Sequence, residues 1–146
     1  MNAVVVSRRK RRINRAGLAR LACAVMAAEG CSPQTELSIV IGDDRWIQDL
    51  NRRYRKRNAP TDVLAFPQEQ GPAEKECLLG DVAISAETAS RQAKALGHSL
   101  EEELAVLLVH GILHLTGWRD DTPAQRRRMM RRTRQLLPQA RRELSP

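Results

Sequence analysis

The sequence predicts an α+β fold, and three observations support this class. Short segments with alternating or clustered apolar residues are typical of strands, whereas longer segments repeat their apolar residues at helical spacing. The strand-like segments lie early in the chain, and the segment with the most helical character lies late. Because no glycine-rich phosphate turn follows a predicted strand, neither a Rossmann or P-loop domain nor a nucleotide cofactor is expected.

Four short segments are predicted to be strands: 3–6, 37–41, 62–66 and 78–85. The second strand is bounded by Pro33 before it and Gly42 after it, and the fourth is interrupted at Gly80. A polar stretch at 68–76, which contains Gly71, is predicted to be a mobile loop between the last two strands.

Five segments are predicted to be helices: 12–29, 44–55, 86–96, one that opens after Ser99, and one from 122 to 137. Asp43 is the expected N-cap of the second helix, and Gly97 is expected to end the third. Ser99 and Glu102 have the spacing of a capping box for the fourth helix. The fifth is expected to stop before Pro138, because proline cannot donate the backbone hydrogen bond that a helix interior needs.

Length and composition favour a single domain, residues 1–146, with a packed core. The chain has 25 Lys and Arg against 17 Asp and Glu, and 42% of its residues are hydrophobic. The positive charge is concentrated at 1–20, at 52–57 and at 126–142, as expected for a surface that binds phosphates. A solvated surface that only confers solubility would have the same pattern. Aromatic residues make up 3%, so any binding of nucleic acid is expected to be mainly electrostatic.

The cysteines and the apolar runs indicate a cytoplasmic protein without a membrane partner. The three cysteines are irregularly spaced and form no CxxC motif, so reduced thiols are expected. The longest apolar run, residues 21–28, is far shorter than the roughly 20 residues that cross a bilayer. The position and alanine content of this run also disfavour a signal peptide.

One segment carries the pattern of a metal site. His110 and His114 are one helical turn apart, so their rings project from the same face of the predicted helix. Gly117 can end that helix in a left-handed conformation and turn the chain back. Asp120, six residues after His114, could then reach the same ion. Two imidazoles and one carboxylate suit a single Zn²⁺, with a fourth position open to water.

Several alternatives remain open for this segment. Asp121 or His98 could replace Asp120 as the third ligand, and both histidines of the motif could be core residues with satisfied hydrogen bonds. The spacing is also that of metzincin proteases, but Gly111 stands where those enzymes carry their glutamate base. A metallopeptidase is therefore disfavoured.

The same segment resembles a known family. Residues 110–120 read HGILHLTGWRD and are similar to the metal-site signature of the YbeY proteins, bacterial metal-dependent endoribonucleases of ribosomal RNA maturation. The resemblance extends upstream, in order, over four segments: ELSIV at 36–40, LNRRYR at 50–55, PTDVLAFP at 60–67 and LGDVAIS at 79–85.

The resemblance implies a small mixed sheet of four strands with a central, zincin-like metal-bearing helix. It implies one zinc ion held by His110, His114 and Asp120, and Arg55 as the active-site arginine at the scissile phosphate. The implied activity is cleavage of single-stranded RNA at the 3′ end of small-subunit ribosomal RNA and in ribosome quality control, with the small ribosomal subunit as partner. Asp120 stands where the family pattern has histidine, and the arginines after residue 126 lie outside the pattern.

One other function, and one other role for Arg55, compete with this expectation. A non-catalytic, RNA-binding ribosome assembly factor would use the metal only as a structural element and would rely on its arginines. Arg55 itself could be no more than a solvated arginine at the end of a helix, since its neighbours carry similar charge.

Overall fold

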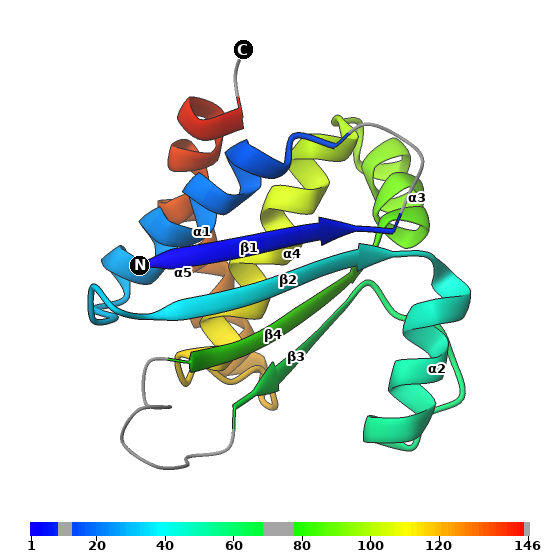
Figure 1. Ribbon diagram of the computed structural model, residues 1–146. Helices are drawn as coiled ribbons and strands as arrows, with labels where there is room; N and C mark the ends of the chain where they lie inside the picture. The colour runs from blue at the N-terminus through cyan, green and yellow to red at the C-terminus, as the bar shows by residue number, and fades with distance from the viewer. Residues whose placement is uncertain (9–12, 69–77, 145–146) are drawn as a thin grey trace.

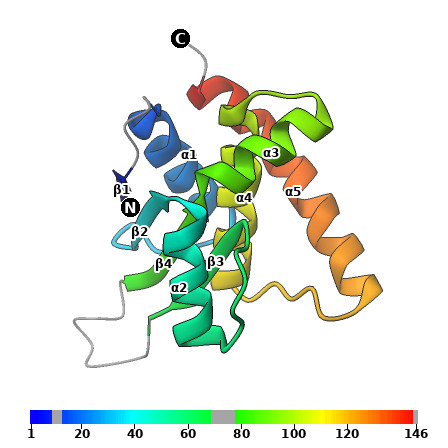
Figure 2. The same ribbon diagram turned by 90° about the vertical axis from the view of Figure 1, so that its right-hand side faces the viewer.

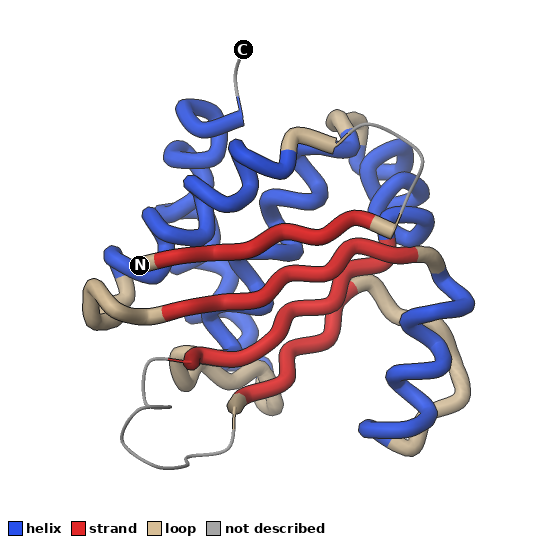
Figure 3. The backbone as a smooth tube through the Cα atoms, viewed as in Figure 1, coloured by secondary structure: helices blue, strands red, loops and turns tan. Residues whose placement is uncertain are grey.

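A computed structural model describes residues 1–8, 13–68 and 78–144 of the chain. Four strands form one sheet in the order β1-β2-β4-β3 (Figure 3). Their bounds are β1 Asn2–Ser7, β2 Glu36–Gly42, β3 Val63–Pro67 and β4 Leu78–Ser85. β1 and β4 both run parallel to β2, and β3 runs antiparallel to β4. The expected α+β class with a mixed sheet of four strands is confirmed.

Five helices accompany the sheet: α1 Arg15–Ala28, α2 Asp44–Arg55, α3 Ala86–Leu96, α4 Leu100–Leu115 and α5 Pro123–Leu144. In Figure 1, α1, α4 and α5 lie behind the sheet, whereas α2 lies apart from them at the right of the view, next to the end of β2. Figure 2 shows α5 on the side of α4 that faces away from the sheet. The central helix α4 is therefore enclosed between the strands and α5.

Successive side chains of β4 contact two different apolar clusters, one on each face of the sheet. Val82 and Ile84 of β4 face the main core, together with residues of β2, α1, α4 and α5. Ala83 points the other way and forms a small second cluster with Ile47 of α2 and Leu64 of β3. This alternation, which follows from the two-residue period of a strand, holds α2 on the face opposite to α4.

The core helix α4 lies against the sheet without an intervening side chain at Gly111. A Cβ atom at this position would be 2.8 Å from Cγ1 of Val82 on β4. Leu108 and Ile112, one turn apart, are fully buried. The histidine-bearing helix is thus fixed to β4 by close packing.

The helix starts follow the capping residues. Asp43 accepts a hydrogen bond from the Trp46 amide, and Ser99 accepts one from the Glu102 amide, as expected for N-caps. Gly97 ends α3 in a left-handed conformation. Asn14 caps α1, which begins at Arg15 and not at residue 12; residues 9–12 lie outside the described residues.

The expected end of α5 at Leu137 is wrong, because the helix continues through Pro138 to Leu144. Leu136 and Ala140 are buried on either side of the proline, which itself is exposed. Glu143 in the last turn also pairs with Arg20 of α1 at 3.0 Å. Tertiary packing of the apolar face therefore outweighs the backbone hydrogen bond that the proline removes.

The remaining expectations concern the polar loop, the cysteines and the membrane. The expected mobile loop at 68–76 lies outside the described residues from position 69 onward, as does Cys77. Cys23 and Cys31 carry free thiols. Among the described residues, no helix is both long and apolar enough to span a membrane.

Candidate metal centre

The last turns of α4 place two histidines side by side. His110 and His114 are four positions apart, and their Nε2 atoms are separated by 3.0 Å. The two rings meet edge to face, with centroids 4.6 Å apart. Both side chains are about one-third exposed, at 35% and 29%. The edge of this pair is therefore open to solvent, while the helix that carries it is buried.

The turn after α4 brings a carboxylate to the same point. Gly117 has φ +106°, a left-handed conformation that favours glycine, and the Trp118 amide donates back to the Leu113 carbonyl at 2.9 Å. The chain then reverses and places Oδ2 of Asp120 near the two rings. This oxygen lies 3.7 Å from Nε2 of His110 and 3.5 Å from Nε2 of His114.

These three side chains have the spacing of a metal-ligand set. Their ligand atoms all lie within 4.8 Å of one another. Two ligand atoms on a tetrahedral zinc-type ion, each about 2.0–2.1 Å from it, are separated by about 3.3 Å, close to the observed distances. His110, His114 and Asp120 therefore fit a single ion and leave a fourth direction toward solvent.

The two other candidates for the third ligand lie in different surroundings. Asp121 accepts hydrogen bonds from the side chain of Arg119, with its Oδ2 at 2.7 Å from Nε. His98 precedes the opposite end of α4, where its Nε2 lies 2.5 Å from Oε2 of Glu103. Within the described residues, Asp120 is the carboxylate that the structure brings to the histidine pair.

The electrostatic environment keeps His110 available as a ligand. Burial is the largest cause that lowers the pKa of His110, and the neighbouring His114 ring lowers it further. The carboxylates of Asp120 and Asp62 act in the opposite direction. Because metals bind the neutral imidazole, a lowered pKa favours coordination at neutral pH.

The position that holds the glutamate base of metzincins has no room for one. Gly111 packs so closely against the buried Val82 side chain that even a methyl group would require this side chain to shift. The segment thus provides a metal-ligand set without the peptidase base, which agrees with the expectation from the sequence.

Arg55 and His114 line the same cleft. It has a volume of about 410 Å³ and is also lined by Ala65 and Pro67 of β3 and by Asp121. Arg55 ends α2 and donates a hydrogen bond of 2.6 Å from Nη2 to the carbonyl of Ala65. Its guanidinium carbon lies 5.4 Å from the centre of the Phe66 ring. Within the described residues the other guanidinium donors of Arg55 have no hydrogen-bond partner, so they can bind an anionic group in the cleft.

Comparison with known proteins agrees with this geometry. A family model described as "Endoribonuclease YbeY" matches residues 5–141, almost the whole chain. The chain belongs to the YbeY endoribonuclease family. Its curated relatives include the Endoribonuclease YbeY of Pelotomaculum thermopropionicum, 45% identical over 124 residues, with 82% of each chain covered. The protein of the same name from Aquifex aeolicus is 48% identical over 118 residues and covers 80% of this chain and 77% of its own.

A solved structure supports the fold independently. The solution structure of TM1509 from Thermotoga maritima aligns with a TM-score of 0.67 and 20% identity, over 97% of this chain and 91% of its own. At this identity the likeness concerns the fold alone.

The structure adds one residue that supports this site and that no sequence pattern singles out. Glu29, the C-cap of α1, accepts a hydrogen bond from Nε1 of Trp118 at 3.2 Å and an ion pair from Nε of Arg132 at 2.8 Å. It therefore ties the turn that carries Asp120 to both α1 and α5. These partners are 89 and 103 positions away, so no local pattern could have revealed them.

Proposed function

We propose that the protein is a zinc-dependent endoribonuclease that cleaves single-stranded RNA, with His110, His114 and Asp120 as ligands and Arg55 at the scissile phosphate. The proposed substrate is ribosomal RNA at the 3′ end of the small-subunit molecule, in maturation and in quality control. Residues 1–146 act as one domain, in the cytoplasm and in contact with the small ribosomal subunit.

The observation that carries the proposal is the shared cleft of His114 and Arg55. Hydrolysis of a phosphodiester needs an activated water and a cation that stabilises the charge developing on the phosphate oxygens. A bound zinc ion would supply the first by lowering the pKa of its water toward neutrality. Arg55, held at the cleft wall by Ala65, supplies the second.

Membership of the family and the charge of the chain support RNA as the substrate. The relatives reported above are named endoribonucleases, and the chain carries a formal net charge of +8. A polyanion is attracted to such a protein without any need for base recognition.

The experiment that tests the proposal is cleavage of a labelled single-stranded RNA by the purified, zinc-loaded protein. Asp120→Ala should abolish cleavage and lower the zinc content, whereas Arg55→Ala should retain the zinc and cleave about a hundred-fold more slowly. Arg57→Ala removes the same charge two residues away, outside the cleft lining, and should cleave at nearly the wild-type rate.

Two results would contradict the proposal. Cleavage that survives Asp120→Ala would exclude the metal centre as its cause. Zinc binding without cleavage of either free RNA or small ribosomal subunits would favour the assembly factor with a structural metal.

A further inference from the structure

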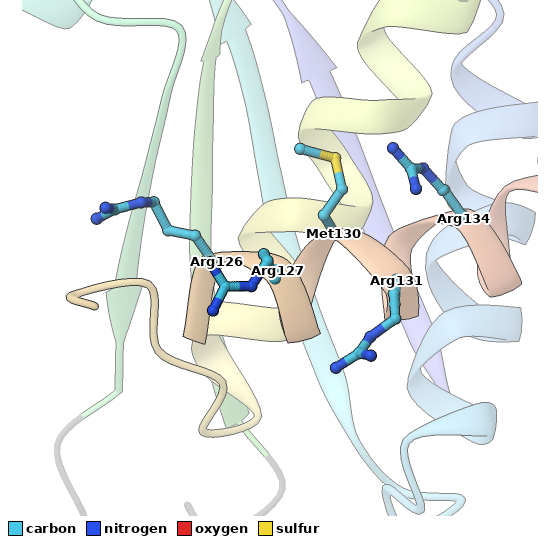
Figure 4. A pocket seen from close by; sticks show the side chains of 5 residues that line it. All are labelled: Arg126, Arg127, Met130, Arg131 and Arg134. Carbon is cyan, nitrogen blue, oxygen red and sulfur yellow. The ribbon is translucent and has the colours of Figure 1, made fainter. Parts of the chain in front are cut away.

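The first half of α5 carries a surface that the metal centre does not use. A hollow of about 510 Å³ is lined by four arginines around Met130, a side chain with 56% of its surface exposed. We call this the α5 arginine surface; it consists of Arg126, Arg127, Met130, Arg131 and Arg134. Figure 4 shows Arg131 on one side of the helix axis and Met130 with Arg134 on the other.

The charges of this surface are not neutralised within the protein. Arg127, Arg131 and Arg134 are exposed and have no hydrogen-bond or ion-pair partner in the part of the chain that the structure describes. Arg132, on the same helix, contrasts with them because Glu29 pairs with it at 2.8 Å. One arginine of α5 therefore stabilises the fold, while its neighbours face solvent.

The arrangement opposes the stability of the helix itself. Arg127 and Arg131 are four positions apart, and Arg131 and Arg134 are three apart, so like charges are neighbours on the helix surface. The first turn of α5 holds no acidic residue, although the positive end of a helix favours one. A bound polyanion would reduce the repulsion between the arginines and would supply negative charge at the positive end of the helix.

The surface begins at the turn that carries the proposed metal ligand. Nη1 of Arg126 donates to the backbone carbonyl of Asp120 at 3.2 Å. A neighbouring hollow of about 350 Å³ is lined by Gly117 and Trp118 of that turn and by Arg128 of α5. Trp118 also lines the cleft that contains Arg55. The second hollow therefore connects the cleft with Arg128, whereas Arg126 joins the α5 arginine surface itself to the turn that carries Asp120.

We infer that the α5 arginine surface binds the phosphate backbone of single-stranded RNA outside the cleavage cleft, with Met130 in contact with a base or ribose. This inference rests on the proposed function, since it concerns the same substrate. The arginines increase affinity through release of counterions and take no part in the chemical step. They bind without preference for sequence, because phosphates carry none.

An acidic protein segment would also complement the charge, but RNA matches more of the surface. Its phosphates repeat at regular intervals, as do the arginines on successive turns, and its bases and riboses offer flat or weakly polar contacts for Met130. The contact of Arg126 with the Asp120 carbonyl places the surface beside the proposed metal centre, so that one strand can reach both sites. An acidic protein has no comparable reason to begin at the metal turn.

The test is a charge-matched pair of triple variants. Arg127→Gln, Arg131→Gln and Arg134→Gln are combined in one protein, and Arg15→Gln, Arg45→Gln and Lys94→Gln, on α1, α2 and α3, in the other. All six side chains are exposed, so both proteins should fold. Binding of a phosphorothioate-linked single-stranded RNA, which resists cleavage, is followed by fluorescence anisotropy between about 50 and 200 mM salt. Cleavage of unmodified RNA and zinc content are measured in parallel.

For the α5 variant we expect at least about a ten-fold loss of affinity and a fall of about 2 in the slope of log K against log salt, at about 0.7 per lost phosphate contact. Its KM should rise, while its kcat and zinc content stay at the wild-type values. Met130→Gln should weaken binding several-fold without changing the slope, because it removes no charge. The control variant should lose less affinity than the α5 variant at every salt concentration.

Three results would overturn the inference. The first is an equal loss in the two triple variants, which would assign the effect to net charge. The second is a loss of affinity for polyglutamate in the α5 variant that equals its loss of affinity for RNA, which would favour an acidic protein as the partner. The third is an α5 variant that binds RNA as tightly as the wild type. Failure of the proposed function would be distinguishable from failure of this inference. In that case the wild type would bind RNA through the α5 arginines but would not cleave it.

Discussion

The two ends of α4 each place histidine beside a carboxylate, but with different results. Before the first turn, Nε2 of His98 lies 2.5 Å from Oε2 of Glu103, whose side chain is only 4% exposed. After the last turn, two imidazoles and the carboxylate of Asp120 surround a common point. The first arrangement satisfies a buried acid with one partner, whereas the second leaves three ligand atoms that can share an ion.

The difference lies in the backbone and not in the residue types. At the start of α4, the histidine and the acid are five positions apart and pair directly with each other. At its end, the i, i+4 spacing aligns two rings, and the left-handed Gly117 returns the chain over them. A histidine near an acid is thus weak evidence for a metal site, whereas helical spacing followed by a glycine turn is much stronger evidence.

The largest effect is expected at the proposed metal centre, at the end of α4. His114→Ala should lose the metal and reduce RNA cleavage by at least about a hundred-fold, because a site that has lost one of three protein ligands holds zinc poorly. His98→Gln retains a donor for Glu103 and should keep both. Elemental analysis and RNA cleavage measure the two quantities. A zinc content of one per chain in His114→Ala would show that the ligand set is different.

In the metal-free protein, the His98–Glu103 pair at the start of α4 should contribute more to the free energy of unfolding than Asp120 does. His98→Ala leaves the buried Glu103 carboxylate without its partner and should lower the free energy of unfolding by about 2 kcal/mol. Asp120→Asn changes a side chain that is 39% exposed and should lower it by less than about 1 kcal/mol. Urea unfolding with EDTA present compares the two. The reverse order would mean that the His98 pair adds little to the fold.

A smaller effect is expected from the anchor of the Asp120 turn. Glu29→Gln replaces the ion pair with Arg132 by a neutral contact, and should cost about 1 kcal/mol of stability and weaken zinc binding several-fold. Glu143→Gln breaks a more exposed pair with Arg20 and serves as the control, with a cost below about 0.5 kcal/mol and unchanged zinc affinity. Competition with a chromogenic chelator measures the zinc affinity. Equal zinc affinities in the two variants would refute the anchoring role.

The smallest effect concerns pH. Burial, assisted by His114, lowers the pKa of His110 in the folded chain, so the unfolded chain takes up this proton first as pH falls through about 6.5. The metal-free protein should therefore lose stability below that pH, until it reaches the folded pKa of His110, and the loss should then level off. His110→Gln should lose less stability over the same range. Urea midpoints measured across pH in EDTA give the comparison, and parallel curves would assign the loss to other groups.

Much of this architecture could be predicted from the sequence because its signals are local. The N-caps Asp43 and Ser99, the apolar pattern of α4 and the turn at Gly117 each depend on residues within a few positions of one another. The convergence of His110, His114 and Asp120 is also local, because it depends on one helical turn and on the chain reversal that follows it.

Features set by distant contacts could not be predicted. The extension of α5 past Pro138 depends on packing against α1, and the role of Glu29 depends on partners in two other elements. The position of α2 on the opposite face depends on which side of β4 Ala83 occupies. In each case the deciding energy came from tertiary structure and not from the local pattern.

The short chain segment that closes the metal centre has a consequence for the order of folding. The three proposed ligands belong to the end of one helix and the turn after it, so bringing them together costs little loop-closure entropy. The cleft, in contrast, exists only after β3 has paired with β4 and α2 has docked through Ile47. An ion could thus be captured while the chain is still mostly unfolded, before Arg55 reaches its place. Metal supply during synthesis would then influence how quickly the native sheet is completed.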